Sequence, residues 1–86
     1  MKNNLRKEKI EIFKCIGREL HILRTKKGVK QVTVAAELNI PQSMLSEIEQ
    51  GKRHSLTLDI IIELSHYYGE QWYKIVQRCV ADEPEK

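Results

Sequence analysis

The segment NIPQSMLSEIEQGKR, residues 39–53, gathers side chains that can donate and accept hydrogen bonds. Leu45 and Ile48, three residues apart, supply the buried edge of a short helix. The opposite edge carries amides, hydroxyls and a carboxylate, with two cations in the turn that follows: Gln42, Ser43, Ser46, Glu47, Gln50, Lys52 and Arg53. A solvated helix usually presents Glu and Lys pairs at helical spacing instead. We therefore interpret this edge as a surface that recognises a partner through hydrogen bonds.

Catalytic and metal-binding patterns are missing from the sequence. His21, His54 and His66 fall on separate segments without Cys or acidic partners at ligand spacing, so we interpret them as ordinary histidines. GKRHS lacks the glycine spacing and the preceding strand of a phosphate loop. Ser43 and Ser46 are expected on a convex helix, which offers no pocket for a nucleophile. We expect neither an enzyme nor a bound metal or cofactor.

Length and composition are typical of one small globular domain. The chain has 86 residues, of which 41% are hydrophobic and 31% charged. No apolar run approaches the roughly 20 residues of a membrane span, and the start MKNNLRKEKI lacks the apolar core of a signal peptide. These observations predict a cytoplasmic protein without a membrane partner. Cys15 and Cys79 are too few for a disulfide scaffold, and both fall at apolar helical positions, so we interpret them as small buried thiols.

Charge is distributed unevenly along the chain, whose formal net charge is +3. Residues 1–30 hold ten Lys and Arg against three Glu, a net charge of +7. Residues 31–58 have a net charge of −1 and residues 59–86 of −3. The positive charge of residues 1–30 favours a polyanionic partner. The alternative is that these residues form a solvated basic helix with no partner.

Helical periodicity covers most of the chain, and no strand-like alternation of useful length is present. Apolar stripes and helix-ending residues predict five helices, over residues 9–27, 31–38, 41–50, 58–68 and 70–80. Gly28, Asn39, Gly51 and Gly69 fit the ends of the first four, and Thr57 fits the N-cap of the fourth. We divide the chain into a basic extension over residues 1–11, for which helix and coil are both open, a helical domain over residues 12–80 and a flexible acidic tail over residues 81–86.

The second and third predicted helices follow a helix-turn-helix pattern. Small or apolar residues recur at the spacing of that motif: Val34, Ala35, Leu38, Ile40, Leu45 and Ile48. From residue 16 to 69 the chain resembles the Cro/repressor-type (XRE-like, lambda-repressor-like) helix-turn-helix family. The matching stretches are IGRELHILRTKKGVKQVTVAAEL and SMLSEIEQGKR. The resemblance implies an all-α, five-helix DNA-binding domain.

The family's base-contacting positions fall on Gln42, Ser43 and Glu47, and Ser46 points to the same side. A Gln amide can bond adenine bidentately, a Ser hydroxyl can serve either base type, and a Glu can accept from a cytosine amino group. For Glu47 the alternative is solvation or an intramolecular pair. For Met44, packing at the core edge competes with contact to a thymine methyl group.

Phosphate contacts are expected on both sides of the third helix. Gln31 opens the second helix, where backbone N–H groups favour an anion. Lys30 stands where the family usually has a capping hydroxyl, and its cation suits a bound phosphate. Lys52 and Arg53, in the loop after the third helix, are further candidates for phosphate contacts. The alternative is that this loop is solvated and binds no phosphate. That loop is one residue longer than in the family, so Ser55 and Thr57 are not assigned to phosphates.

Arg24 and Glu49 are expected to form a structural ion pair. Glu49 follows Leu45 by four residues and falls on the inward side of its helix, where an unpaired carboxylate is costly. Arg24 matches the position from which the family supplies a buried Arg partner.

The leading functional hypothesis is a sequence-specific transcription regulator that binds double-stranded DNA at an inverted-repeat operator as a homodimer. One recognition helix per subunit contacts too few base pairs for useful specificity. The 70–80 helix is the expected dimer element because one small core cannot easily bury all of its larger side chains: Trp72, Tyr73, Val76 and Val80. The alternative is that all four pack within the monomer. The alternative is an antitoxin-like or adaptor protein with another protein as main partner, through residues 1–11 or the 70–80 helix. A domain that keeps the fold without DNA binding is a third hypothesis.

Overall fold

The computed structural model describes residues 2–53 and 56–80, and this part of the chain consists of α-helices, turns and loops without a strand. The helices are α1 (Lys2–Lys27), α2 (Gln31–Leu38), α3 (Gln42–Glu49), α4 (Leu58–Tyr68) and α5 (Trp72–Val80). The prediction of an all-α, five-helix domain is therefore confirmed for the described residues.

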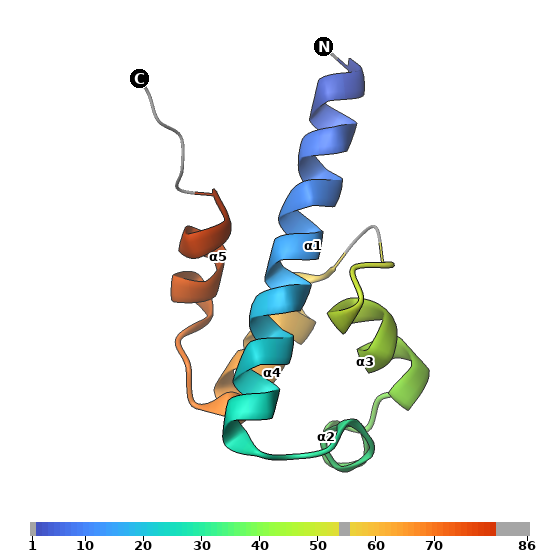
Figure 1. Cartoon of the computed structure of the whole chain (residues 1–86), viewed down its shortest axis with the longest axis vertical. Helices are drawn as coiled ribbons and strands as arrows, with labels where there is room; N and C mark the ends of the chain where they lie inside the picture. Colours follow the sequence, from blue (N-terminus) through green and yellow to red (C-terminus); the bar gives the residue numbers. More distant parts are fainter. Residues whose placement is uncertain (1, 54–55, 81–86) are drawn as a thin grey trace.

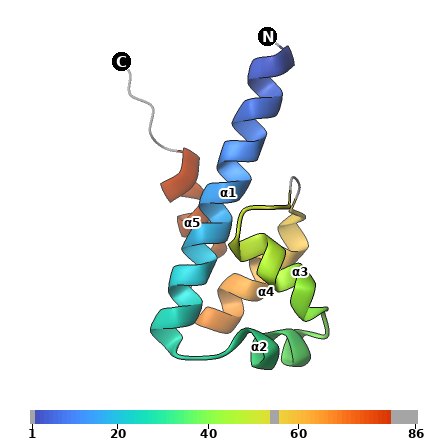
Figure 2. The ribbon, with the colours of Figure 1, turned by 45° about the vertical axis from the view of Figure 1, so that its right-hand side comes forward.

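Helix α1 is the axis around which the other helices are arranged (Figure 1). Its 26 residues account for the 41 Å long dimension of the molecule, which measures 21 and 19 Å in the other two directions. Figure 1 shows α5 on one side of α1 and α2 and α3 on the other, with α4 behind. The turned view in Figure 2 shows that the first turns of α1 extend beyond the remaining helices.

The hydrophobic core receives a fully buried side chain from every helix: Leu20, Val34, Leu45, Leu64 and Ile75 are each 0% exposed. Ile16, Ile48, Ile60 and Ile61 surround them. Since no pair of short helices could bury its apolar stripe alone, the core forms only when all the helices meet. α3 is thus fixed to the body through its inward edge.

Local capping explains why several helix boundaries follow from the sequence. The backbone N–H of Ile60 donates to Thr57 Oγ1 at 3.3 Å, which caps α4 as predicted. Asn39 ends α2 with φ 59°, a left-handed conformation that Asn tolerates well. The bounds of α2 and α4 match the prediction, whereas α3 and α5 are slightly shorter. α1 begins at Lys2, seven residues before the predicted start.

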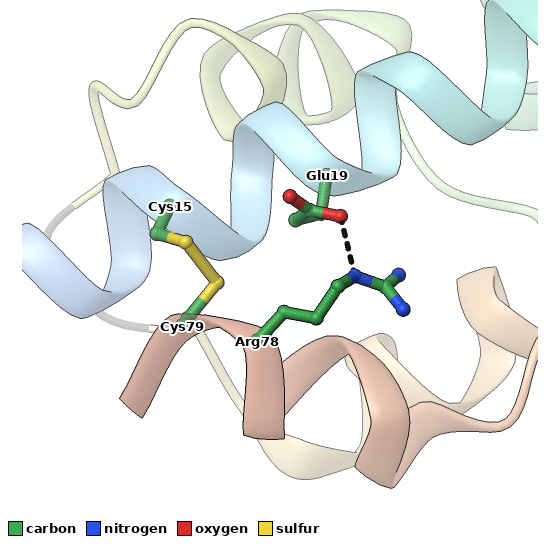
Figure 3. The surroundings of a disulfide bond; sticks show 4 residues. All are labelled: Cys15, Glu19, Arg78 and Cys79. Atoms are coloured by element: carbon green, nitrogen blue, oxygen red, sulfur yellow. Dashed lines mark hydrogen bonds and ion pairs between the residues drawn. A yellow bond between two sulfur atoms is a disulfide. The ribbon is translucent and has the colours of Figure 1, made fainter. Parts of the chain in front are cut away.

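A disulfide joins α1 to α5, so the interpretation of Cys15 and Cys79 as buried thiols is wrong. Their Cα atoms lie 5.7 Å apart although 64 positions separate them in the sequence. Figure 3 shows the bond running between the two helices, beside Glu19 and Arg78. The packing of α5 against α1 brings the two cysteines within bonding range, and this proximity has no local sequence signal.

The predicted extension, residues 1–11, is continuous with the domain from Lys2 onward, because α1 runs through it without a break. His54, Ser55 and the predicted acidic tail of residues 81–86 lie outside the described residues. Within the described ranges, no helix has the length and apolar character needed to cross a membrane.

Candidate nucleic-acid interface

A tight turn at Asn39 sets the angle between α2 and α3. The backbone N–H of Ile40 donates to the Ala35 carbonyl at 3.0 Å, which closes the turn. Ala35 is 3% exposed, and its small side chain lets the two helices pack closely. Because Leu45 and Ile48 are buried, the opposite face of α3 is directed away from the core.

The outward face of α3 is polar, as the sequence predicts. Gln42, Ser43 and Glu47 are exposed, and Ser46 is half-buried. Gln50 Nε2 donates to Ser46 Oγ at 2.6 Å, so Ser46 is already engaged by its own helix. Met44 is half-buried and packs against the core, in line with the core-edge alternative. The face offers amide, hydroxyl and carboxylate groups on a convex surface of the width that a major groove accepts.

Glu47 has an intramolecular partner in this structure. Arg53 Nη1 lies 3.3 Å from Glu47 Oε1, and the two side chains are 38% and 52% exposed, respectively. Exposed ion pairs contribute about 0–1 kcal/mol, so this contact opens easily. The structure thus brings one predicted base-contacting residue and one predicted phosphate-contacting residue together.

Behind α3, Arg24 and Glu49 form a two-point ion pair. Arg24 Nε donates to Glu49 Oε2 at 2.7 Å, and Nη2 donates to Oε1 at 3.0 Å. The Glu49 side chain is 3% exposed and that of Arg24 is 13% exposed. Arg24 Nη1 also donates to the Val29 carbonyl at 2.8 Å, which links the pair to the loop before α2. The planar guanidinium therefore joins α1, this loop and the end of α3.

The electrostatics of the pair favour its charged form. Burial on its own would raise the pKa of Glu49, but hydrogen bonds from Arg24, Gln31 and His21 outweigh it and the pKa is lowered. The hydrogen bond to Glu49 raises the pKa of Arg24 despite the opposing effect of burial. Both groups are therefore ionised at neutral pH.

A chain of hydrogen bonds connects this ion pair to the outward face. Gln31 Nε2 donates to Glu49 Oε1 at 2.9 Å. Gln42 Nε2 lies 3.5 Å from Gln31 Oε1, at the long end of hydrogen-bond range. Since Glu49 can only accept, it fixes which end of the Gln31 amide faces Gln42. The sequence predicts a phosphate contact for Gln31, and the structure gives this side chain a second set of partners.

His21 is a contact of Glu49 that the sequence patterns did not predict. Its Nδ1 lies 2.9 Å from Glu49 Oε1, a hydrogen bond that requires the proton on Nδ1. His21 precedes Arg24 by three residues, which places both on one face of α1. Because Arg24 is expected to face Glu49, this spacing is a usable signal for His21.

Gly17 allows α1 to approach the end of α3. A Cβ atom at this position would overlap the backbone carbonyl of Ile48. Gly17 is buried and lies one turn before His21 on the same side of α1. This close approach brings Arg24 and His21 within reach of Glu49.

The predicted phosphate-contacting residues lie on both sides of α3. Lys30 is the N-cap of α2, is exposed, and makes no side-chain capping hydrogen bond. Lys52 is exposed and Arg53 half-buried in the loop after α3. Thr57 serves as the cap of α4. In the described part of the chain, no group of His, Cys, Asp and Glu side chains has a metal-binding arrangement.

Comparison with known proteins identifies one match. The family model described as helix-turn-helix matches residues 20–74, more than half of the chain. No curated protein and no solved structure matches the chain. The matched segment contains α2, α3, Arg24 and Glu49, whereas Cys15 and Cys79 lie outside it.

Proposed function

The chain belongs to the Cro/repressor-type helix-turn-helix family of DNA-binding transcription regulators, and we propose that it binds an inverted-repeat operator as a homodimer. The observation that carries this proposal is the outward face of α3, polar along its length above the buried Leu45 and Ile48. A helix with this face fits the major groove, where base edges present donors and acceptors.

In the proposed complex, Gln42, Ser43, Ser46 and Glu47 contact bases. Gln42 is in the first turn of α3, which enters the groove most deeply in this docking mode. Its hydrogen bond to Gln31 uses one N–H, so the carbonyl oxygen and the second N–H stay available. These two groups match N6 and N7 of adenine. Gln31 and Glu49 thereby orient the amide of Gln42 before DNA binds.

The proposed phosphate contacts come from Lys30, Gln31, Lys52 and Arg53. Lys30 and Gln31 lie at the N-terminus of α2, where backbone N–H groups and the helix dipole favour an anion. Arg53 exchanges its exposed contact with Glu47 for a phosphate. This exchange leaves Glu47 available to accept from an amino-bearing base edge.

Dimerisation is proposed through α5. Ile75 on this helix is fully buried, but Tyr73 is 45% exposed and Val80 48% exposed. Trp72 and Val76 are only partly buried against the core. The exposed apolar area is of the kind that a second copy would cover. Two α3 helices related by a twofold axis would then read two half-sites.

A protein partner is the second candidate function, and one observation favours it. The first turns of α1 extend beyond the other helices (Figure 2) and carry Leu5, which is 56% exposed. An adaptor or antitoxin-like role would use this part of α1 as its binding surface. In that case, mutations on the outward face of α3 would leave the protein's main interaction unchanged.

Selection from a random-sequence duplex library tests the proposed function. We expect recovered sequences to contain two related half-sites, one helical turn or a multiple of about 10–10.5 base pairs apart. Light scattering of the bound species should give two chains per duplex. A variant with Gln42→Ala, Ser43→Ala and Glu47→Ala is the control, since it keeps the buried edge of α3 and should enrich no sequence. Equal recovery with both proteins would contradict the proposal.

A further inference from the structure

The disulfide between α1 and α5 lies outside the segment that matches the helix-turn-helix family. This segment spans residues 20–74, so Cys15 precedes it and Cys79 follows it. Cys15 and Cys79 are both half-buried, so the bond sits at the edge of the core and not inside it. Figure 3 shows the bond and the Glu19–Arg78 ion pair side by side between the two helices. The covalent link therefore joins two residues that flank the matched helix-turn-helix segment.

The attachment of α5 differs between its two ends. At the start, Ile75 is 0% exposed and Trp72 packs against the core. At the end, Cys79 carries the covalent link and Val80 is 48% exposed. A helix of nine residues has little stability of its own in water. The last turn of α5 thus depends on contacts with α1.

Besides the disulfide, Arg78 is the polar attachment of this turn. Its Nε donates to Glu19 at 2.9 Å, and its Nη1 donates to Glu70 at 3.1 Å. The Arg78 side chain is 43% exposed, and ion pairs this exposed contribute little. The disulfide holds Arg78 opposite Glu19 because Cys79 is its neighbour in the chain. Loss of the bond would weaken both attachments together.

We propose that Cys15 and Cys79 form a thiol–disulfide exchange site, and that a dithiol reductant opens it and releases the last turn of α5 from α1. A thiolate of the reductant attacks one sulfur, the Cys15–Cys79 bond breaks, and the departing cysteine takes up a proton. The second thiol of the reductant then loses its proton and attacks the mixed disulfide, and the other cysteine leaves and takes up a proton. Two electrons pass to the protein, and the reductant leaves as its disulfide. A disulfide-bearing partner reverses the reaction.

Release of α5 would also change DNA binding, and this consequence rests on the proposed function. Tyr73 and Val80 lie on the helix assigned to the dimer. With its last turn detached, α5 would no longer hold Val80 in a fixed position beside Tyr73, which stays in the first turn. The reduced protein is then expected to dimerise less and to bind two half-sites less tightly than the oxidised protein.

Glutathione titration of the full chain, with alkylation and mass measurement, tests the exchange site. In the native protein, Cys15 and Cys79 should convert fully between the disulfide and the two thiols as the ratio of reduced to oxidised glutathione is varied. Glu19→Gln, which removes the ion pair and keeps both cysteines, should make dithiothreitol reduce the bond about twofold faster, since an ion pair this exposed contributes little. A bond that resists both reduced glutathione and dithiothreitol until the protein is unfolded would overturn the proposal, because it would then be a purely structural cross-link.

Amide hydrogen exchange tests the release of α5. Amides of residues 76–80 should exchange on the order of tenfold faster in the reduced protein, while those of α4 around the buried Leu64 stay unchanged. The double variant Cys15→Ser with Cys79→Ser should match the reduced protein in both redox conditions. Equal exchange rates of residues 76–80 in the oxidised and the reduced protein would overturn the proposal. This comparison uses the unmodified chain and does not depend on whether the double variant folds.

Binding to a random-sequence duplex pool at low salt separates this proposal from the proposed function. Weaker DNA binding by the reduced form than by the oxidised form supports both the exchange site and the proposed DNA-binding function. If neither form binds DNA but α5 is released on reduction, the exchange site is supported and the operator proposal is contradicted. If both forms bind and dimerise equally, dimer control by this bond is overturned.

Discussion

Several donors of the interface converge on one acceptor, Glu49. Arg24, Gln31 and His21 all lie within hydrogen-bond distance of its carboxylate. The inward position of Glu49 predicts a cationic partner, and the resemblance to the helix-turn-helix family is what placed that partner at Arg24. The contact from Gln31 was not predictable, since side-chain partners across 18 residues leave no periodic signal. Glu49 thus links the folding of α1 against α3 to the orientation of the proposed base-contacting Gln42.

Arg24→Ala and Glu49→Ala are expected to be strongly coupled. Each single change leaves a buried charge or buried donors without a partner and should cost about 3–5 kcal/mol of unfolding free energy. The double variant should lose less than the sum, with a coupling of about 1–3 kcal/mol. Urea denaturation of the unmodified protein, the two single variants and the double variant gives the double-mutant cycle. Additive losses would mean that the two side chains act independently, against the geometry described.

Stability should fall in acid in a way that depends on Glu49. Its pKa is lowered in the folded protein, so the folded state binds this proton less readily than the unfolded state does. The contribution is fully present above the unfolded value of about 4.3 and is lost as the pH falls through the folded pKa. Urea denaturation at pH values from neutral to acidic measures it. Glu49→Gln, which cannot titrate, should show a shallower acid loss; an unchanged slope would contradict the assignment.

Among the helices, those with clear capping residues were predicted best. Thr57, Asn39 and Gly69 mark the ends of α2 and α4, and their local backbone requirements are visible in the sequence. The early start of α1 was not predicted, because Leu5 is the sole apolar residue of this helix before residue 10 and one residue makes no apolar stripe. The disulfide was missed for a different reason, since pairing of Cys15 with Cys79 depends on how α1 and α5 pack.

The contact between α1 and α3 should not tolerate a side chain at Gly17. Gly17→Ala would ordinarily stabilise a helix interior by up to about 1 kcal/mol. Here the added Cβ meets the Ile48 carbonyl, and such overpacking typically costs about 1–3 kcal/mol. Thermal unfolding should therefore show a net loss of stability. Arg18→Ala, at the exposed neighbouring position, is the control and should be close to neutral. A stabilised Gly17→Ala variant would contradict the close approach of the two helices.

For the whole molecule, charge differs between the two ends of the chain. Residues 1–30 have a net charge of +7 and supply Lys30, whereas residues 59–86 have a net charge of −3. This asymmetry favours approach of a polyanion to the basic part of the molecule. Dimer geometry could not be derived from the sequence, because it depends on which exposed residues of α5 a second copy covers.

DNA affinity should depend steeply on salt. If a dimer makes about 6–10 phosphate contacts, log K falls linearly with log salt with a slope near −0.9 per contact. Lys30→Ala and Lys52→Ala should each reduce the slope by roughly one for every phosphate that the variant no longer binds, without changing the preferred sequence. Lys74→Ala on α5 is the control and should keep the slope. A flat salt response of the unmodified protein would contradict phosphate binding by this surface.

The placement of α3 in the major groove is best tested by a binding titration of Gln42→Ala on a selected operator, on each single-base variant of it and on random DNA. Gln42 is exposed in the first turn of α3, and its amide is held by Gln31. We expect the substitution to cost about 1–3 kcal/mol on the operator, to remove discrimination at one base pair per half-site, and to change affinity for random DNA little. Equal weakening on all sequences would mean that Gln42 contacts the backbone alone, and would contradict the proposed docking of this helix.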